Sequence, residues 1–376
     1  MSEQICVRCT IMRGGTSRAV FLNENHVPRD IEERKHFILA LFGSPDARQI
    51  DGLGGAEVLT SKCAIIGPST RPDADVDYTF LQVGIADSTV STEIICGNIS
   101  SAVGPYAIEE GFVRWKEPIT TVRVYNTNTD KIMLINVPVK DGHPLVEGDY
   151  IVDGVPGSGA EIQVDYSYTI GSSTGKLLPT DNVIDQIFIP SLNRNIEISI
   201  VDIATISAFF RAEDIGLTGI EKPNEISQEK IKVFEEIRQA ASDLCGLPKE
   251  NFITPFTIAV ASSKSFKVFS TGKLVDAEEV DFVTRMTASG TIHKALSGAA
   301  ASCVSVASQI PGTIVNQCTA SVEQPRYVRV GHPSGVIKTY TDVVSKNGEV
   351  MVNSVCFSRT ARRIMEGYAY IRKARL

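Results

Sequence analysis

The sequence predicts an α+β protein of two similar domains, each a curved β-sheet or barrel around one central helix. The first observation is the length of 376 residues, because such a chain is too long for a single comfortable core. The second is a set of sequence markers that recur in the same order. The third is that strand patterns bounded by Gly, Pro, Asn and Asp outnumber helical patterns. In addition, each half holds one helical segment with small residues on nearly every side.

The repeat fixes the expected order of elements. The matched segments are 11–25 with 200–214 (strand-like), 31–42 with 227–244 (helical), 61–67 with 255–261 (strand-like) and 97–103 with 298–304 (helical). The first pair is offset by 189 positions and the last by 201. We therefore expect one domain over residues 1–184 and a second over residues 185–376, with the boundary between Asp181 and Asp185.

The helix expected in the first half begins with Cys96-Gly97-Asn98, which places a thiol at its first turn. Unpaired amide N–H groups and the helix dipole favour anions there, whether a thiolate or the carboxylate of a ligand. A buried, inert core thiol is the alternative. If the starts of both central helices face one cleft between the domains, two positive helix ends can hold a substrate with two carboxylates.

Composition excludes several classes of protein. The formal net charge of −7 argues against a nucleic-acid partner. No segment approaches a membrane span, and the first residues lack the basic and apolar regions of a secretory signal, so we expect a cytoplasmic protein without a membrane partner. Its eight scattered cysteines should then stay reduced. Cys6 and Cys9 lie three apart in a strand pattern and point to opposite faces, so we predict no metal site there or elsewhere.

Of three further loops, one is rejected as a nucleotide site and two leave alternatives open. Residues 171–177 look like a phosphate-binding loop, but the glycine spacing is one residue short and Leu177 replaces the required Ser or Thr, so nucleotide binding is rejected. His293-Lys294 either adds positive charge before the second central helix or is a solvated pair. Residues 331–335 form a turn whose Ser334 and Gly335 amides could hold a carboxylate, or a plain turn.

Several motifs together resemble the PrpF family. They are residues 12–17, 51–55 with 60–62, 96–98, 174–179, 331–335 and 360–365. The resemblance runs nearly the whole length and implies the diaminopimelate-epimerase-like fold, with the active site in the interdomain cleft. It also implies cofactor-independent proton transfer next to a carboxylate. Two positions depart from the family pattern: Arg18 stands where many members have Lys, and Thr205-Ile206 replaces an Asn-Pro.

The resemblance also implies the site residues. It makes Lys62 the catalytic partner of Cys96; from the sequence alone, a Lys in an apolar strand needs a partner or a cleft, or lies at an exposed edge. The second central helix starts at Ser297-Gly298 and reaches Cys303 only later, so a symmetric two-thiol epimerase is disfavoured. The expected substrate-binding residues are Thr16, Ser17, Arg18, Gly97, Asn98, Ser297, Gly298, Ser334 and Gly335. For residues 16–18 a hairpin turn with a surface Arg is the competing interpretation.

The expected function is a cofactor-independent isomerase that shifts an allylic proton in a small unsaturated dicarboxylate, foremost methylitaconate to 2,3-dimethylmaleate. The alternatives are a 2-methylaconitate cis-trans isomerase, whose third carboxylate Arg18 or Lys294 could clamp, and an oxalomesaconate tautomerase. A carboxylate-binding accessory protein of an aconitase-like dehydratase is the non-enzyme alternative. Whether Lys62 or Cys96 is the base stays open, and a homo-oligomer is allowed.

Overall fold

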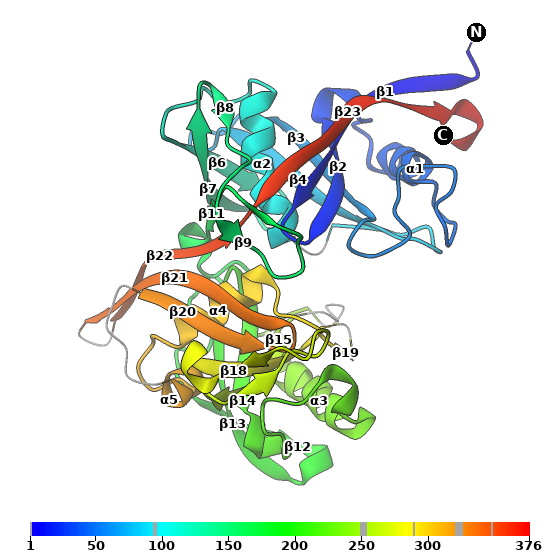
Figure 1. The fold of residues 1–376 in the computed structure, drawn as a ribbon. Coiled ribbons are helices and arrows are strands. Elements are labelled where there is room, and N and C mark those ends of the chain that lie inside the picture. Colours follow the sequence, from blue (N-terminus) through cyan, green and yellow to red (C-terminus); the bar gives the residue numbers. More distant parts are fainter. Residues whose placement is uncertain (1, 93–95, 249–253, 289, 320–325, 347–348) are drawn as a thin grey trace. The chain divides into compact units, whose positions relative to one another are not determined.

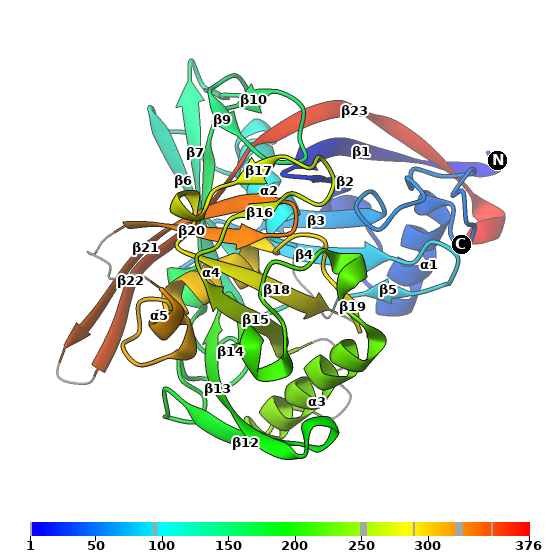
Figure 2. The same cartoon turned by 60° about the horizontal axis from the view of Figure 1, so that its bottom comes forward.

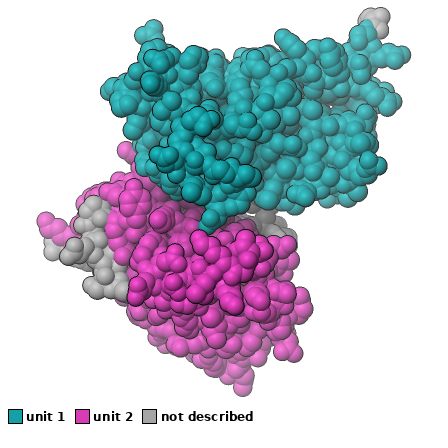
Figure 3. Space-filling model, viewed as in Figure 1, with its two compact units in different colours: residues 1–164, 358–376 teal, residues 165–357 magenta. Residues whose placement is uncertain are grey.

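The computed structural model describes residues 2–92, 96–248, 254–288, 290–319, 326–346 and 349–376. The chain forms two compact units, residues 1–164 with 358–376 and residues 165–357 (Figure 3). These units divide the chain elsewhere than at the expected 184/185 boundary. The chain passes between them inside two strands, β11 (Ile162–Asp165) and β22 (Glu349–Arg359).

The described residues of the first unit form a strand-rich shell with two α-helices. Its elements are β1 (Gln4–Gly14), β2 (Ser17–Asn23), α1 (Ile31–Phe42), β3 (Lys62–Pro68), β4 (Val76–Val83), β5 (Val90–Ser91), α2 (Gly97–Glu109), β6 (Ile119–Asn126), β7 (Lys131–Lys140), β8 (His143–Pro144), β9 (Tyr150–Ile151), β10 (Ser158–Gly159) and β23 (Ala361–Arg372). Strands β1 and β2 form a hairpin, β2 runs parallel to β3, β3 antiparallel to β4, β4 parallel to β6, and β6 antiparallel to β7.

The C-terminal strand explains why the units are not contiguous in sequence. Strand β23 pairs antiparallel with β1 along its length, from Gln4 opposite Arg372 to Gly14 opposite Ala361. Figure 1 shows this strand, in red, beside the blue first strand. A pairing between the two ends of the chain has no local sequence signal, so the sequence-based division could not anticipate it.

The second unit repeats the same plan. Its elements are β12 (Asp185–Ile189), β13 (Arg194–Ile203), β14 (Thr205–Arg211), α3 (Gln228–Leu244), β15 (Phe256–Ser262), β16 (Phe266–Lys267), β17 (Leu274–Val275), β18 (Phe282–Ala288), β19 (Thr291–Ile292), α4 (Gly298–Ala307), α5 (Ile314–Cys318), β20 (Arg326–His332) and β21 (Gly335–Lys346). Strands β13 and β14 form a hairpin, β14 runs parallel to β15, β15 antiparallel to β18, β18 parallel to β20, and β20 antiparallel to β21.

The repeat found in the sequence is confirmed down to single positions. Phe21 pairs with Ala64 across two parallel strands, and the equivalent Phe210 pairs with Ala259. The hairpin turns also match, because Gly15 has a φ of 48° and Ala204, 189 positions later, has a φ of 59°. The expected outer helices are confirmed as well, and Figure 2 shows α3 against β12 and β15.

The two small-residue helices are the centres of their units. In α2 every residue from Gly97 to Ile108 except Asn98 is buried, and it contacts β1, β2, β3, β6, β7 and β23. All residues of α4 are buried, in contact with β13, β14, β20 and β21. Small side chains allow this enclosure: a Cβ added to Gly104 would lie 2.7 Å from the Cγ2 of Val137. None of the helices in the described parts of the chain has the length and hydropathy needed to cross a bilayer.

Candidate active site

Lys62 is a buried cation in the first unit. It is the first residue of β3, its exposed fraction is only 5%, and its Nζ lies 5.2 Å from the centre of the Phe80 ring. No carboxylate of the described residues lies within ion-pair distance of this ammonium. Burial of a charge without an opposite charge is costly, so an anion entering this place would be favoured. The alternative of an exposed edge position is wrong.

The neutral partner of Lys62 is Gln82, which lies directly opposite it on β4. The Nζ donates to the Oε1 of Gln82 over 2.5 Å. The Nε2 of Gln82 donates to the carbonyls of Ser61 (2.9 Å) and Val58 (3.3 Å). Since these carbonyls accept only, the amide oxygen must face the lysine. Sequence reasoning missed Gln82, because a glutamine in an alternating strand carries no special signal.

Cys96 is the N-cap residue of α2, as the sequence predicts. Its side chain makes no capping hydrogen bond, and it is half-buried. Its carbonyl accepts from the backbone N–H of Ser100 (2.9 Å) and from the Ser100 hydroxyl (3.0 Å). The thiol is therefore held at a helix start, where the unpaired amides of the first turn favour an anion.

The Gly14-Gly15 pair lets this helix start lie against the hairpin between β1 and β2. A Cβ on Gly14 would lie 2.2 Å from the carbonyl oxygen of Asn98, and a Cβ on Gly15 would lie 2.2 Å from the Oδ1 of Asn98. Gly15 also has the positive φ that side chains disfavour. The motif is thus a steric requirement for placing Asn98 next to Thr16.

Asn98 joins a chain of hydrogen bonds at that contact. The Nε of Arg359 donates to the Oδ1 of Asn98 (2.9 Å), and the Nδ2 of Asn98 donates to the Oγ1 of Thr16 (3.0 Å). Arg13 supports the same turn, because its Nη1 donates to the carbonyls of Gly15 (3.0 Å) and Thr360 (2.9 Å). Sequence reasoning missed Arg359, although it directly precedes the motif at residues 360–365.

The other two residues of the predicted Thr16-Ser17-Arg18 set lie in β2. Ser17 is buried, with an exposed fraction of 2%, and its hydroxyl has no hydrogen-bond partner among the described residues. A buried orphan hydroxyl is unusual in a folded protein and is consistent with a place for a ligand. The backbone N–H of Arg18 donates to the carbonyl of Leu59 (3.0 Å), and its guanidinium lies against Gly55.

In the second unit, the predicted binding residues occupy two places. Ser297 is the N-cap of α4, and its hydroxyl accepts from the N–H of Ala300 (3.2 Å). A Cβ on Gly298 would lie 2.2 Å from the ring of Phe357, so this helix start needs glycine. Ser334 donates its N–H to the Nδ1 of His332 (3.2 Å) and its hydroxyl to the carbonyl of Lys294. Its amide is thus engaged internally, and the binding roles of Ser297, Gly298, Ser334 and Gly335 stay predictions.

Two titrating groups near α4 are not suited to carry charge. Cys303 lies inside the helix, where burial raises the pKa of its thiol to about 12 and the Sγ donates to the carbonyl of Val201 (3.4 Å). Burial also lowers the pKa of His293, whose Nδ1 lies 2.7 Å from the carbonyl oxygen of Ala295 and 3.0 Å from the backbone nitrogen of the same residue. The expectation that Cys303 is no counterpart of Cys96 agrees with its burial, and His293 is neutral near pH 7.

The loop at residues 171–177, whose sequence resembles a phosphate-binding loop, binds a carboxylate of the chain itself. The Oδ2 of buried Asp202 accepts from the backbone N–H groups of Ser173 and Thr174, each over 2.8 Å. The hydroxyls of Ser172 (3.0 Å) and Thr174 (2.9 Å) also donate to this carboxylate. The donors that a nucleotide phosphate would need are already used.

The two cysteines of the C-x-x-C segment do not share a face of their strand. Cys6 is exposed and Cys9 buried on β1, so the two thiols point to opposite faces as predicted. No group of three or more His, Cys, Asp or Glu side chains suited to a metal occurs in the described ranges of the chain.

The sequence and the structure of this chain are similar to those of known proteins. The chain is 45% identical to the 3-methylitaconate isomerase of Eubacterium barkeri, with both chains fully covered. It is 36% identical to the 2-methyl-aconitate isomerase of Shewanella oneidensis, over 98% of each chain. A crystal structure of methylitaconate-delta-isomerase superposes with a TM-score of 0.90 at 45% identity, covering 100% of this chain and 97% of that one.

More distant structures show the fold. A hydroxyproline epimerase from Agrobacterium vitis superposes with a TM-score of 0.55 at 12% identity, over 98% of this chain and 93% of that one. The fold is therefore that of the epimerases, as the sequence predicts. The model of the PrpF protein family matches residues 4–372, and the chain belongs to this family.

Proposed function

We propose that this protein is an isomerase that moves an allylic proton in a small unsaturated dicarboxylate. The observation that carries the proposal is the buried ammonium of Lys62, whose neighbours among the described residues are a neutral amide and an aromatic ring and include no carboxylate. Such a group can attract a carboxylate substrate, exchange a proton and stabilise a developing negative charge. The family membership and the named isomerases among the relatives support the same reaction class.

We propose methylitaconate, 2-methylene-3-methylsuccinate, as the substrate. A base removes the proton from C3, which is both alpha to a carboxylate and allylic, and the electron pair spreads into a dienolate. A proton then adds to the methylene carbon, so the double bond moves to C2=C3 and 2,3-dimethylmaleate forms. One C–H bond is broken and one is made, so no oxidant, reductant or cofactor is needed.

Lys62 and Cys96 are the proposed proton-transfer groups. Both belong to the first unit, on β3 and at the start of α2, and α2 packs against β3. Protonated Lys62 also supplies positive charge for the dienolate, and the Gly97 and Asn98 amides supply donors at a helix start. Whichever group acts as base, removing the ammonium should be more harmful than altering an exposed lysine.

None of the eight cysteines forms a disulfide, which suits a reducing compartment, and we propose that the enzyme acts in the cytoplasm. The identity of 45% to the 3-methylitaconate isomerase, against 36% to the 2-methyl-aconitate isomerase, favours the dicarboxylate over the tricarboxylate. Oxalomesaconate is a third candidate, because a (4E)-oxalomesaconate Delta-isomerase of Novosphingobium sp. is 33% identical.

The test is turnover of three candidate substrates in deuterated water, followed by proton NMR without added cofactor or metal. We expect conversion of methylitaconate to 2,3-dimethylmaleate, with faster turnover than of 2-methylaconitate or oxalomesaconate. Lys62→Met should lower kcat by at least about 10³-fold, since it removes both a proton-transfer group and a fixed charge. Lys140→Met, at the exposed end of β7, is the matched control and should keep full activity.

The outcomes separate the candidates. Preferential conversion of 2-methylaconitate or oxalomesaconate would reassign the substrate within the family. Binding of all three compounds without conversion or deuterium uptake would contradict the isomerase and leave the carboxylate-binding accessory protein. Full activity of Lys62→Met would remove Lys62 from the mechanism.

A further inference from the structure

We propose that Arg359 is a positioning residue that acts through Asn98 to make the Thr16 hydroxyl a hydrogen-bond donor for a substrate carboxylate. This inference rests on the proposed function. The three residues come from three separate parts of the first unit: the turn before β2, the first turn of α2, and the end of β22. The two hydrogen bonds that link them measure 2.9 Å and 3.0 Å.

The direction of this chain of hydrogen bonds is set at the arginine. A guanidinium can only donate, so the Asn98 atom that faces the Nε of Arg359 must be the amide oxygen. The other end of the Asn98 amide is then an NH₂ group, which must donate to the Oγ1 of Thr16. No other assignment of the amide satisfies both contacts.

The consequence falls on Thr16. Its oxygen accepts the bond from Asn98, so its own O–H is left to donate, and it donates to no other group among the described residues. The positive charge of Arg359 polarises both bonds in the same direction, which strengthens the terminal donor. A donor of this kind suits an anionic acceptor, and the adjacent Ser17 hydroxyl also has no hydrogen-bond partner within the described part of the chain.

The surroundings hold Arg359 and Asn98 in this arrangement. The Nη1 of Arg359 donates to the carbonyl of Ser358 (2.9 Å), and the hydroxyl of Ser101 donates to the carbonyl of Asn98 (2.7 Å). A Cβ on Gly15 would lie 2.2 Å from the Oδ1 of Asn98 and 2.8 Å from the Cδ of Arg359. The glycine therefore provides the space in which the arginine and the amide meet.

The test is a double-mutant cycle on kcat/KM for the converted substrate. Thr16→Val removes the donor and should lower kcat/KM by about 10- to 100-fold, the usual effect of a hydrogen bond to a charged group. Arg359→Ala should lower it by a similar factor, mainly through KM. If Arg359 acts through Thr16, the double variant should be no worse than the more severe single variant.

Asn98→Asp tests the direction of the chain without removing the arginine contact. The carboxylate still accepts from Arg359 but cannot donate to Thr16, so the loss should equal that of Thr16→Val. This variant also serves if Arg359→Ala does not fold. Arg359→Lys should restore part of the affinity, and Arg362→Ala, an exposed arginine on β23, is the matched control and should behave as wild type.

The same cycle is measured on the dissociation constant of 2,3-dimethylsuccinate, a saturated dicarboxylate that cannot react. If the wild-type protein converts none of the substrates, but the effects of Arg359→Ala and Thr16→Val on binding of this probe are still not multiplicative, the isomerase is contradicted and the positioning role of Arg359 is kept. Multiplicative losses for Arg359→Ala and Thr16→Val, wild-type values for Asn98→Asp, or no binding of this probe by the wild-type protein would each overturn the inference.

Discussion

The Nζ of Lys62 lies 2.5 Å from the Oε1 of Gln82, in a cross-strand pair between β3 and β4. Two backbone carbonyls turn the amide of Gln82 so that its oxygen meets the ammonium. The pair keeps a buried cation in place without neutralising it, because an amide carries a dipole and no net charge. Lys62 therefore keeps its charge available for an anionic ligand.

Replacing this neutral partner with a charged one should impair the site. Gln82→Glu should form an ion pair with Lys62 and repel a carboxylate substrate, raising KM by about tenfold or more. It should also lower the melting temperature, because its second oxygen faces the carbonyls of Ser61 and Val58 and cannot donate to them. Steady-state kinetics and a melting curve measure the two effects. Gln186→Glu, exposed on β12, is the control. An unchanged KM in Gln82→Glu would show that the ammonium does not meet the substrate.

The two central-helix cysteines should differ in function. Cys96→Ser should lower kcat by about 10²- to 10⁴-fold if the thiol transfers a proton. Cys303→Ser should stay within about twofold of wild type, because the buried thiol, with its pKa raised to about 12, is protonated throughout the working pH range. Steady-state kinetics of both variants measures these effects. Labelling of the folded wild-type protein with iodoacetamide at pH 8, read by mass spectrometry, compares the reactivity of the two thiols. Labelling of Cys303 in the folded protein would contradict this prediction.

The absence of a side chain at Gly15 should be important for activity mainly because a Cβ there would clash with Asn98, and less because of the positive φ. Gly15→Ala should cost about 1–2 kcal/mol of stability from the positive φ and should also lower kcat/KM by displacing Asn98. Gly157→Ala is the matched control, since Gly157 has a φ of 78° with nothing within 4 Å of the added Cβ. Denaturant unfolding should show a larger loss of stability for Gly15→Ala than for Gly157→Ala, because only the first adds a steric clash to the strained φ. Equal activity in the two would remove the steric argument.

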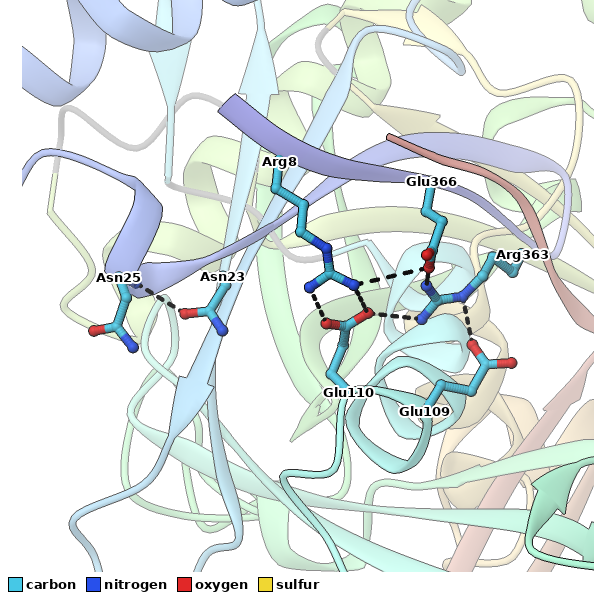
Figure 4. A network of polar contacts seen from close by, with 7 residues as sticks. All are labelled: Arg8, Asn23, Asn25, Glu109, Glu110, Arg363 and Glu366. Atoms are coloured by element: carbon cyan, nitrogen blue, oxygen red, sulfur yellow. Dashed lines mark hydrogen bonds and ion pairs between the residues drawn. The ribbon is translucent and has the colours of Figure 1, made fainter. Parts of the chain in front are cut away.

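Acid stability should depend on the ion-pair network at the end of α2. Figure 4 shows Glu110 between Arg8 and Arg363, with Nη1–Oε2 and Nη2–Oε1 distances of 2.6 Å and 3.0 Å. Burial by itself would raise the pKa of Glu110, but hydrogen bonds from the two arginines outweigh it, so the pKa is lowered.

The sign of the effect follows from that direction. Because the folded pKa lies below the unfolded one, the stabilisation is complete above about pH 4.3 and is lost as the pH falls through the folded pKa. Glu110→Gln should therefore have a lower free energy of unfolding than wild type at pH 7. The difference in free energy of unfolding between the two proteins should become smaller towards pH 3. Urea unfolding at several pH values measures it, with the exposed Glu366→Gln as control. A difference in free energy of unfolding that does not vary with pH would show that the pKa of Glu110 is not lowered in the folded protein.

Much of the fold could be predicted because its signals are local. The helix at 31–42 coincides with α1, and Ser227 caps α3 through its hydroxyl, which accepts from the N–H of Lys230 (3.4 Å). The two enclosed helices followed from their small side chains. The repeat was visible because equivalent positions, such as Phe21 and Phe210, meet the same packing demand in each unit.

By itself the sequence determined the two-fold plan and the helix start at Cys96, since side-chain size and capping are properties of neighbouring residues. It also made Lys62 a candidate through the resemblance to a family. Only the tertiary structure decided the partners. Gln82 and Arg359 join the site through contacts spanning 20 and 261 residues, and the C-terminal strand joins the first unit by pairing with β1. Such pairings are set by packing and register between distant segments, which no local pattern encodes.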